Sequence, residues 1–340
     1  MTCTYFLGAN SARGFSSLYN TFPPQGSFLH IIKGGPGTGK SGFMRAIGAE
    51  AERRGMNVEY VLCSGDPSSL DGVYIPALNT AWADGTAPHA LDPEIFGVTA
   101  DYVNLGRFCR MPFTGESVNT IVDITRRYRA MYAEGYKYIA AAGQLRQISE
   151  YSLSPLAKRL DIIMRRCRPE GSHTERRIFL RAISCEGIIS LADRLTGYDE
   201  AYVFTSGFGG DICALELVRR EAARRGLAVI TAMSPLMPEQ IDAILLPGTG
   251  TAFFSSEYSI EAARHIRLDS MLTSRPDAAS IAGRRNAAAI ADKLLALAVG
   301  RLRAAKALHD ELELQYRPYM DFPALTEFTN EELRRTFNEI

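Results

Sequence analysis

The chain of 340 residues predicts an α/β fold of two lobes, each a mainly parallel sheet flanked by helices, with helical extensions. Three observations predict this fold. An apolar run suited to a buried strand passes through a glycine-rich loop into residues at helical spacing. Residues of the first half recur in the second half at matching positions. Each half ends in a long stretch of helical periodicity, which predicts helices that extend from the lobes.

The glycine-rich loop at residues 34–41 fits the pattern G-x-x-x-x-G-K-[ST] of a nucleotide-binding P-loop. Its glycines let the backbone approach a phosphate without Cβ clashes, and N–H groups at a helix start form an anion nest. Lys40 supplies an ammonium for the β and γ phosphates, and the Ser41 hydroxyl can ligate Mg²⁺. The pattern predicts that ATP and Mg²⁺ bind through Gly34, Gly35, Pro36, Gly37, Thr38, Gly39, Lys40 and Ser41.

The elements of the first half follow from periodicity and turn residues. A strand is expected before the loop at residues 28–32. The helix after the loop should run to about Arg54 and stop at Gly55, a residue type that often ends helices. Other expected elements are a short strand at 4–7, a short helix at 14–19, strands at 58–62 and 80–83, a lid rich in Pro, Gly and aromatic residues at 87–115, and helices at 117–150 and 155–167.

A polar, turn-rich stretch at residues 168–173 is the predicted domain boundary, which gives a first lobe of residues 1–168 and a second of residues 169–340. After this stretch the chain repeats itself. Residues 50–81 match residues 221–252 without a gap, which indicates a tandem duplication of P-loop-type lobes. Matched pairs include Phe6 with Phe179, Leu7 with Leu180, Ala9 with Ala182, Glu50 with Glu221, Gly55 with Gly226, Val58 with Val229, Pro67 with Pro238 and Thr80 with Thr251.

The second copy of the loop lacks the reactive residues of the first. Residues 205–212 place Asp211 where Lys40 stands and Ile212 where Ser41 stands. An aspartate there would repel a triphosphate, and isoleucine cannot ligate magnesium. We therefore expect the second lobe to be a structural partner. Its final helix, predicted at about residues 277–316, is interpreted as packing the two lobes together rather than as a coiled coil for a partner.

A P-loop needs a carboxylate at the end of a neighbouring strand to hold the Mg²⁺ shell. Asp84 is the first candidate, because it ends the apolar run 80–83 and its counterpart in the second copy is Ser255. Asp66, which follows the strand at 58–62, is the second candidate. The predicted catalytic residues are therefore Lys40, Asp84 and Asp66, and the predicted metal ligands are Ser41 and Asp84.

Other polar side chains have simpler interpretations. Asp71 is retained as Asp242 in the degenerate copy, which favours a capping or structural role. His89 and Asp92 could orient a water or an acceptor hydroxyl, but a turn whose histidine bonds the backbone is the preferred interpretation. A solvated face is likewise preferred to an arginine finger for the two arginines of the expected lid, Arg107 and Arg110.

The composition argues against several function classes. Lys and Arg together number 38, as do Asp and Glu, so bulk attraction to nucleic acid or an anionic membrane is not expected. The six cysteines are scattered, without C-x-x-C or metal-ligand spacing, and are interpreted as reduced thiols of a cytosolic protein. No basic region followed by a long apolar one opens the chain, and no apolar run reaches membrane-spanning length. We expect a cytoplasmic location and no membrane partner.

These features together resemble a poorly characterised bacterial family of ATPase-like proteins with two tandem P-loop halves. Beside the loop, the resemblance rests on residues 5–6, 13–15, 19, 69–73, 84–89 and 309–313, and it covers most of the chain. It implies nucleotide binding. Both halves usually carry a working P-loop in that family, so the departures at Asp211 and Ile212 argue against a two-site cooperative cycle here.

The predicted function is that of a Mg²⁺-dependent ATP-binding protein, a slow ATPase with one active and one degenerate site. Two alternatives remain open. One is a small-molecule or nucleoside kinase in which residues 87–115 close over the acceptor, and the other is a regulatory or scaffold module that binds nucleotide with little turnover. ATP is preferred to GTP because no guanine-reading Asn-Lys-x-Asp stretch is present. A nucleic-acid motor is disfavoured by the neutral charge.

Overall fold

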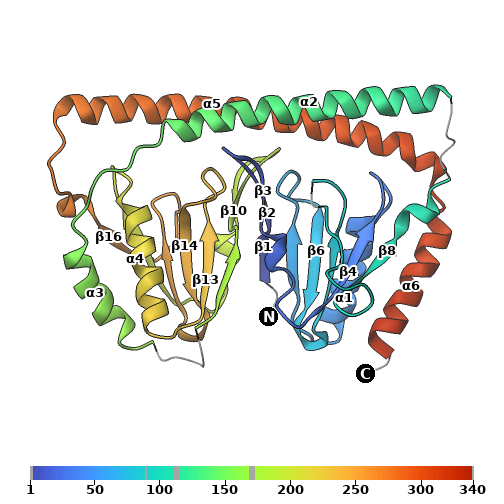
Figure 1. Cartoon of the computed structure of the whole chain (residues 1–340), viewed down its shortest axis with the longest axis horizontal. Coiled ribbons are helices and arrows are strands. Elements are labelled where there is room, and N and C mark those ends of the chain that lie inside the picture. Colours follow the sequence, from blue (N-terminus) through green and yellow to red (C-terminus); the bar gives the residue numbers. More distant parts are fainter. Residues whose placement is uncertain (1–2, 89, 111–114, 168–172, 339–340) are drawn as a thin grey trace.

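The computed structural model describes residues 3–88, 90–110, 115–167 and 173–338. It contains two α/β halves that stand side by side, each built on a six-stranded sheet with helices packed against it (Figure 1). Two long helices, α2 (Glu116–Gln144) and α5 (Ala278–Tyr316), run in opposite directions across the ends of both sheets (Figure 1). The predicted α/β class, with mainly parallel sheets flanked by helices, is confirmed at this level.

The two sheets have the same strand order. In each sheet one strand, β6 or β14, is antiparallel to both of its neighbours, and the other pairs are parallel. The first sheet runs β1 (Cys3–Phe6), β5 (Glu59–Leu62), β6 (Leu70–Ile75), β7 (Thr80–Asp84), β4 (Phe28–Lys33), β8 (Ala100–Asn104). The second runs β9 (Glu175–Ile178), β13 (Val229–Met233), β14 (Ile241–Leu246), β15 (Thr251–Phe254), β12 (Glu200–Thr205), β16 (Arg264–Arg267).

The helices follow the predicted spacing, with some shifted ends. Helix α1 (Lys40–Arg53) stops just before Gly55, whose φ of +76° suits a helix end, and its counterpart is α4 (Gly210–Arg224). Helix α2 stops at Gln144, before the expected end at residue 150. The carboxylate of Asp277 caps α5 by accepting the Ser280 N–H at 2.7 Å. Of the described helices, none is long and apolar enough to cross a bilayer.

The shorter helices complete the two halves. Helix α3 (Ser154–Met164) agrees with its prediction, whereas α6 (Phe322–Asn338) was not predicted. The 3₁₀ turns are Tyr19–Thr21, Pro76–Leu78, Leu105–Phe108, Ala192–Arg194, Pro247–Thr249, Asp269–Met271 and Arg317–Tyr319.

Two predictions for the first half were wrong. Residues 14–19, expected as a helix, contain β3 (Gly14–Ser17), which pairs with β2 (Gly8–Ser11) in a hairpin. Gly14 has a φ of +86°, so it follows the tight turn between the strands at little steric cost. The expected lid at 87–115 contains β8, which pairs with β4 as the sheet edge, so this part belongs to the sheet. The second half repeats the hairpin with β10 (Arg181–Ser184) and β11 (Gly187–Ser190).

The two halves meet at the edge strands β1 and β9. The N–H of Phe6 donates to the carbonyl of Phe179 at 2.9 Å, and the N–H of Phe179 donates back to Phe6 at the same distance. Both side chains are fully buried, and Arg176 of β9 pairs with Glu59 of β5 at 2.7 Å. The apolar core continues through this contact, so the halves form one folded unit. One cluster combines Tyr5, Leu7, Ile178, Leu180 and Val203.

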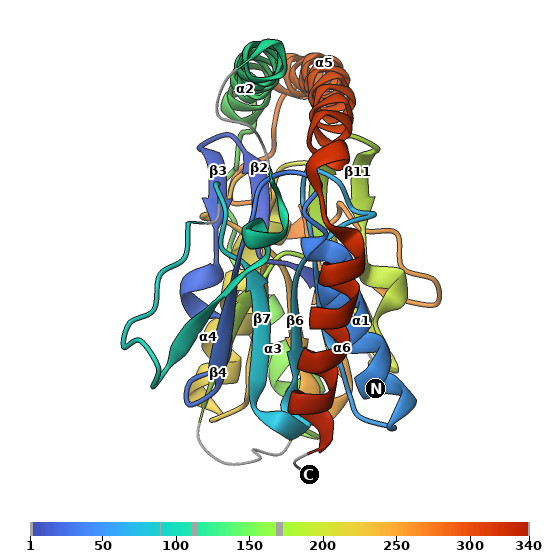
Figure 2. The same ribbon diagram turned by 90° about the vertical axis from the view of Figure 1, so that its right-hand side faces the viewer.

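Each half is completed by a helix that follows the long helix of the other. Helix α3 packs against α4, and Leu160 is buried in one cluster with Phe204 and Leu215 of the second half. Helix α6 lies along α1 of the first half (Figure 2), where the ring of Phe328 stacks on Phe43 at 6.0 Å between centroids. The boundary near residue 168 therefore separates the two halves in sequence, but each core contains residues from both sides of it.

Replacing Leu160 with alanine should lower the free energy of unfolding by about 2–5 kcal/mol, because it removes a fully buried side chain from the α3–α4 contact. Ile162→Ala, on the exposed side of the same helix, should change it by less than about 0.5 kcal/mol. Urea unfolding followed by circular dichroism measures both. Equal effects would contradict the packing of α3 on the second half.

Candidate functional site

The first glycine loop, residues 34–41, joins β4 to α1. Gly37 and Gly39 have φ of +68° and +85°, in the left-handed region that glycine adopts at little cost. Gly39 is the N-cap of α1, so the N–H groups of the first helical turn, which have no partner inside the helix, lie at the loop. The buried Thr38 closes the loop on itself, because its Oγ1 donates to the Gly35 carbonyl at 2.8 Å.

Lys40, the first residue of α1, folds back over the loop. Its Nζ donates to the carbonyl oxygens of Gly34 and Gly35, both at 2.9 Å, and lies 3.6 Å from Asp84 Oδ2. The side chains of Lys40 and Asp84 are each 13% exposed, so water screens their attraction only in part. The ammonium is thus held by the loop carbonyls and one carboxylate.

Asp84 reaches Lys40 because of the strand order. Strand β7 pairs in parallel with β4, and Asp84 stands opposite Ile32, just before the loop. Asp84 Oδ1 accepts hydrogen bonds from the Thr86 N–H at 2.8 Å and from the Thr86 hydroxyl at 2.6 Å. These two bonds direct the other oxygen, Oδ2, to Lys40. The structure therefore brings together two of the predicted catalytic residues.

The other predicted polar residues make different contacts. The Ser41 hydroxyl oxygen accepts the Leu70 N–H at 2.9 Å and has a second lone pair that can bind a cation. Asp66 Oδ1 accepts the hydroxyl of Ser68 at 2.6 Å, and Oδ2 lies 3.4 Å from Nζ of Lys306 on α5. Strands β6 and β7 lie between β4 and β5, the strand that precedes Asp66. Asp66 is thus paired with the second half.

The remaining candidates hold neighbouring segments in place. The carboxylate of Asp92 accepts a hydrogen bond from the hydroxyl of Tyr102 on β8 at 2.8 Å. His89 lies outside the described residues. The guanidinium of Arg107 lies over an aromatic ring of α6, 4.4 Å from its centroid. Arg110 pairs with Asp321, just before α6, at 3.5 Å. The side chains of these two arginines contact α6, the residue before it and Phe108, which gives no support to an arginine-finger role.

The residues that sequence reasoning missed come from the last turns of α5. Glu313 Oε1 accepts the Gly37 N–H at 3.2 Å, and the ring of Tyr316 packs against Gly35. Helix α6 in turn covers Gly39. Helices of the second half therefore contact three glycines of the first loop. Helical periodicity marks Tyr316 as a packing residue but gives no sign of the contact that Glu313 makes.

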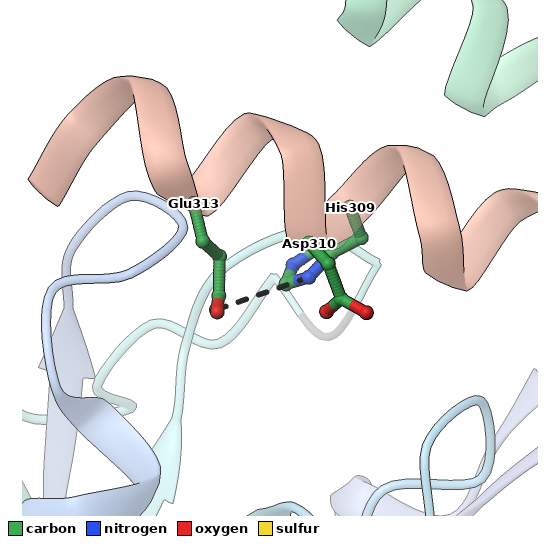
Figure 3. Close-up of side chains that lie close together, drawn as sticks. All are labelled: His309, Asp310 and Glu313. Atoms are coloured by element: carbon green, nitrogen blue, oxygen red, sulfur yellow. Dashed lines mark ion pairs between the residues drawn. The ribbon is translucent and has the colours of Figure 1, made fainter.

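Figure 3 shows His309, Asp310 and Glu313 projecting from α5, with the ion pair between His309 and Glu313 dashed. Their ligand atoms lie within 4.8 Å of one another, a spacing that could hold a metal ion. Both carboxylates already have other partners, since Asp310 pairs with Lys306 and Glu313 binds the loop. Burial lowers the pKa of the His309 imidazole, and the nearby carboxylates of Glu313 and Asp310 oppose that shift. We interpret the group as a polar network beside the loop.

The second glycine loop, residues 205–212, also ends in a left-handed glycine at a helix start, and protein groups pack against it as they do at the first loop. Gly209, with a φ of +77°, is the N-cap of α4, and Ser206 Oγ accepts the N–H of Gly210 at 3.0 Å. A Cβ on Gly210 would lie 2.4 Å from the ring of Tyr151, in the segment after α2. An aromatic ring therefore lies against the start of this helix.

Asp211, which replaces Lys40, has a structural role in the second half. Its Oδ2 accepts the N–H of Ser256 at 2.9 Å and the hydroxyl of Ser256 at 2.6 Å. The residue is only 5% exposed. These bonds stabilise a carboxylate where the first half has an ammonium, so the second loop cannot present a cation from this position.

Asp242, the counterpart of Asp71, is also structural. It accepts the hydroxyl of Ser255 at 3.0 Å and pairs with the buried Arg181 at 3.2 Å. Burial raises the pKa of Asp242, and Arg181 opposes that rise. Ser255 itself stands where the first half has Asp84. The residues of the second site thus belong to the internal hydrogen bonding of that half.

The surface hollows described for this chain lie elsewhere. One of about 480 Å³ lies between α3 and α4, and several of its charged residues form ion pairs, as Glu221 does with Arg224. Another of about 290 Å³ lies beside α1 and is lined by Arg45, Glu52 and Tyr60. Both are open to solvent, unlike the enclosed and mostly apolar pockets that bind small molecules.

No protein-family model matches the chain, and no significant match was found among curated proteins or solved structures.

Replacing Asp211 with alanine should lower the free energy of unfolding by about 1–3 kcal/mol, because the buried carboxylate accepts two charge-assisted hydrogen bonds from Ser256 and both are lost. Thermal and urea unfolding measure the change. Asp193→Ala, at an exposed aspartate of the same half, is the control and should be near neutral. A neutral Asp211→Ala would contradict the structural role.

Proposed function

We propose that the first half is a P-loop lobe that binds ATP with Mg²⁺ and hydrolyses it slowly, and that the second half is a degenerate lobe without a nucleotide. The loop at residues 34–41 carries the proposal. It has glycines in the left-handed region, a helix that starts at Lys40, and Asp84 at the end of the neighbouring parallel strand. A cytoplasmic location is part of the proposal.

Each group at the loop would have its own role. The N–H groups at the start of α1 would bind phosphate oxygens, and the helix dipole would favour their charge. Lys40 would exchange the carbonyls of Gly34 and Gly35 for phosphate oxygens, which form stronger, charge-assisted hydrogen bonds. Ser41 and Asp84 would hold Mg²⁺, which neutralises charge that develops on the phosphates during hydrolysis.

The donors present fit that ion. Mg²⁺ prefers oxygen ligands such as carboxylates and hydroxyls. The Ser41 hydroxyl in α1 and the Asp84 carboxylate at the end of β7 supply one of each beside Lys40. The bonds from Thr86 fix Asp84 Oδ1 and direct Oδ2 toward Lys40. Asp66 enters the proposal only through its pairing with Lys306, which links the site to α5.

Comparison of the two halves supports the proposal. Both members of the Lys40–Asp84 pair are replaced in the second half, by Asp211 and Ser255, although the strand order is the same. Loss of one member alone would leave an uncompensated, partly buried charge. The frame of the fold therefore does not need this pair, which points to chemistry at the first loop.

A regulatory nucleotide-binding module with little turnover is the second candidate. It is favoured by the contacts of α5 and α6 with the loop glycines, because a ligand at the loop would disturb both helices. The kinase alternative has less support, since β8 takes up part of the segment expected to close over an acceptor. Incubation with ATP alone separates the candidates, because an ATPase releases phosphate without an acceptor, whereas the module binds ATP and releases little.

Lys40→Ala should weaken MgATP binding about 10- to 100-fold, because charge-assisted hydrogen bonds contribute about 1.5–3 kcal/mol. Phosphate release should fall with it. Titration calorimetry and a phosphate-release assay measure the two quantities, and Lys158→Ala, at an exposed lysine of α3, is the matched control. If the wild-type chain binds no nucleoside triphosphate, or if Lys40→Ala binds as tightly, the proposed function is wrong.

A further inference from the structure

The end of α5 sits directly on the first glycine loop. The Gly37 N–H donates to Glu313 Oε1 at 3.2 Å, and a Cβ on Gly37 would lie 3.3 Å from the carbonyl oxygen of Glu313. The backbones of the loop and the helix therefore approach closely, at a position where a side chain would be crowded and the φ of +68° would strain it. In Figure 3, Glu313 points from α5 toward the elements of the first half.

The contact has the chemistry of a phosphate contact. A carboxylate oxygen and a phosphate oxygen both accept a hydrogen bond from a loop N–H near a helix start, and the helix dipole favours both. Lys40 donates to its own loop carbonyls in the same structure. Both the amide of Gly37 and the ammonium of Lys40 are thus satisfied by groups of the chain.

We propose that Glu313 is a built-in anion that competes with nucleotide for the first loop, so that binding of nucleotide displaces Glu313 and moves the end of α5. The inference rests on the proposed function of the loop. Phosphate and carboxylate exclude one another here, because both would take the Gly37 N–H and like charges repel at short range in a half-buried site.

The displaced helix end is connected to both halves. Helix α5 packs along α2, which leads to the segment that carries Tyr151 and lies against the second loop. Helix α5 also leads into α6, which covers Gly39 and packs on α1. A phosphate at the loop would therefore shift the elements that hold the halves together, which gives the degenerate half a role in sensing nucleotide at the first.

Glu313→Gln tests the competition, because it keeps the size of the side chain and removes its charge. We expect MgADP and MgATP to bind this variant about fivefold more tightly or better, since a repelling charge is lost. Glu311→Gln, at an exposed glutamate of the same helix, should stay within about twofold of wild type. Titration calorimetry measures the affinities, and a thermal melt verifies that each variant is folded.

The outcomes separate this inference from the proposed function. If the wild-type chain binds no nucleotide, both are wrong. If the wild-type chain binds and Glu313→Gln binds equally or more weakly, the competition is wrong and the proposed function stands. Hydrogen exchange gives a second readout: MgATP should raise exchange of the amides at residues 309–316 in the wild-type chain, and unchanged or slower exchange would overturn the displacement of α5.

Discussion

The whole arrangement depends on one antiparallel bridge between Phe6 and Phe179. These residues occupy equivalent places in the repeat, and each donates its N–H to the carbonyl of the other at 2.9 Å in a fully buried position. Such a contact is self-complementary, like the interface of a symmetric dimer. It sets β1 beside β9 and leaves both glycine loops under the long helices, which explains why α5 reaches the first loop and the segment after α2 reaches the second.

Helices α3 and α6 hold the two halves together further, because each belongs to one half in sequence and packs against the other. Because α3 fills the core of the second half and α6 that of the first, neither core is complete without the other half's extension. The frame is nearly symmetric, but its chemistry is not. Lys40 and Asp84 stand at one loop, and Asp211 with its bonds to Ser256 stands at the other. A symmetric frame that carries the Lys40–Asp84 pair at one loop suits a protein in which one half responds to the other.

The sequence predicted the local features well, because their causes are local. The left-handed glycines, the helix from Lys40 and the strand end at Asp84 follow from residue type and spacing within a few positions. The hairpin at Gly14 was missed because its strands are short and their pairing is decided by the turn. Strand β8 was missed because its flanks are rich in turn residues, and only pairing with β4 makes it a strand.

The sequence could not predict the contacts that join residues of the two halves. Glu313 and Gly37 are far apart in the chain, and nothing in the helical pattern of α5 distinguishes an acidic residue on a loop amide from one in solvent. The same holds for Asp66, whose placement after a strand suggested a site beside Lys40, whereas the fold pairs it with Lys306. Such contacts arise only once both halves and their exchanged helices are assembled.

Equilibrium dialysis of the full chain with Mg²⁺ and a non-hydrolysable ATP analogue is the most direct test of the central claim. The account predicts saturation at one nucleotide for each chain, with the affinity lowered in Lys40→Ala and kept in Asp211→Ala. Saturation at two nucleotides for each chain, or no binding at all, would contradict it.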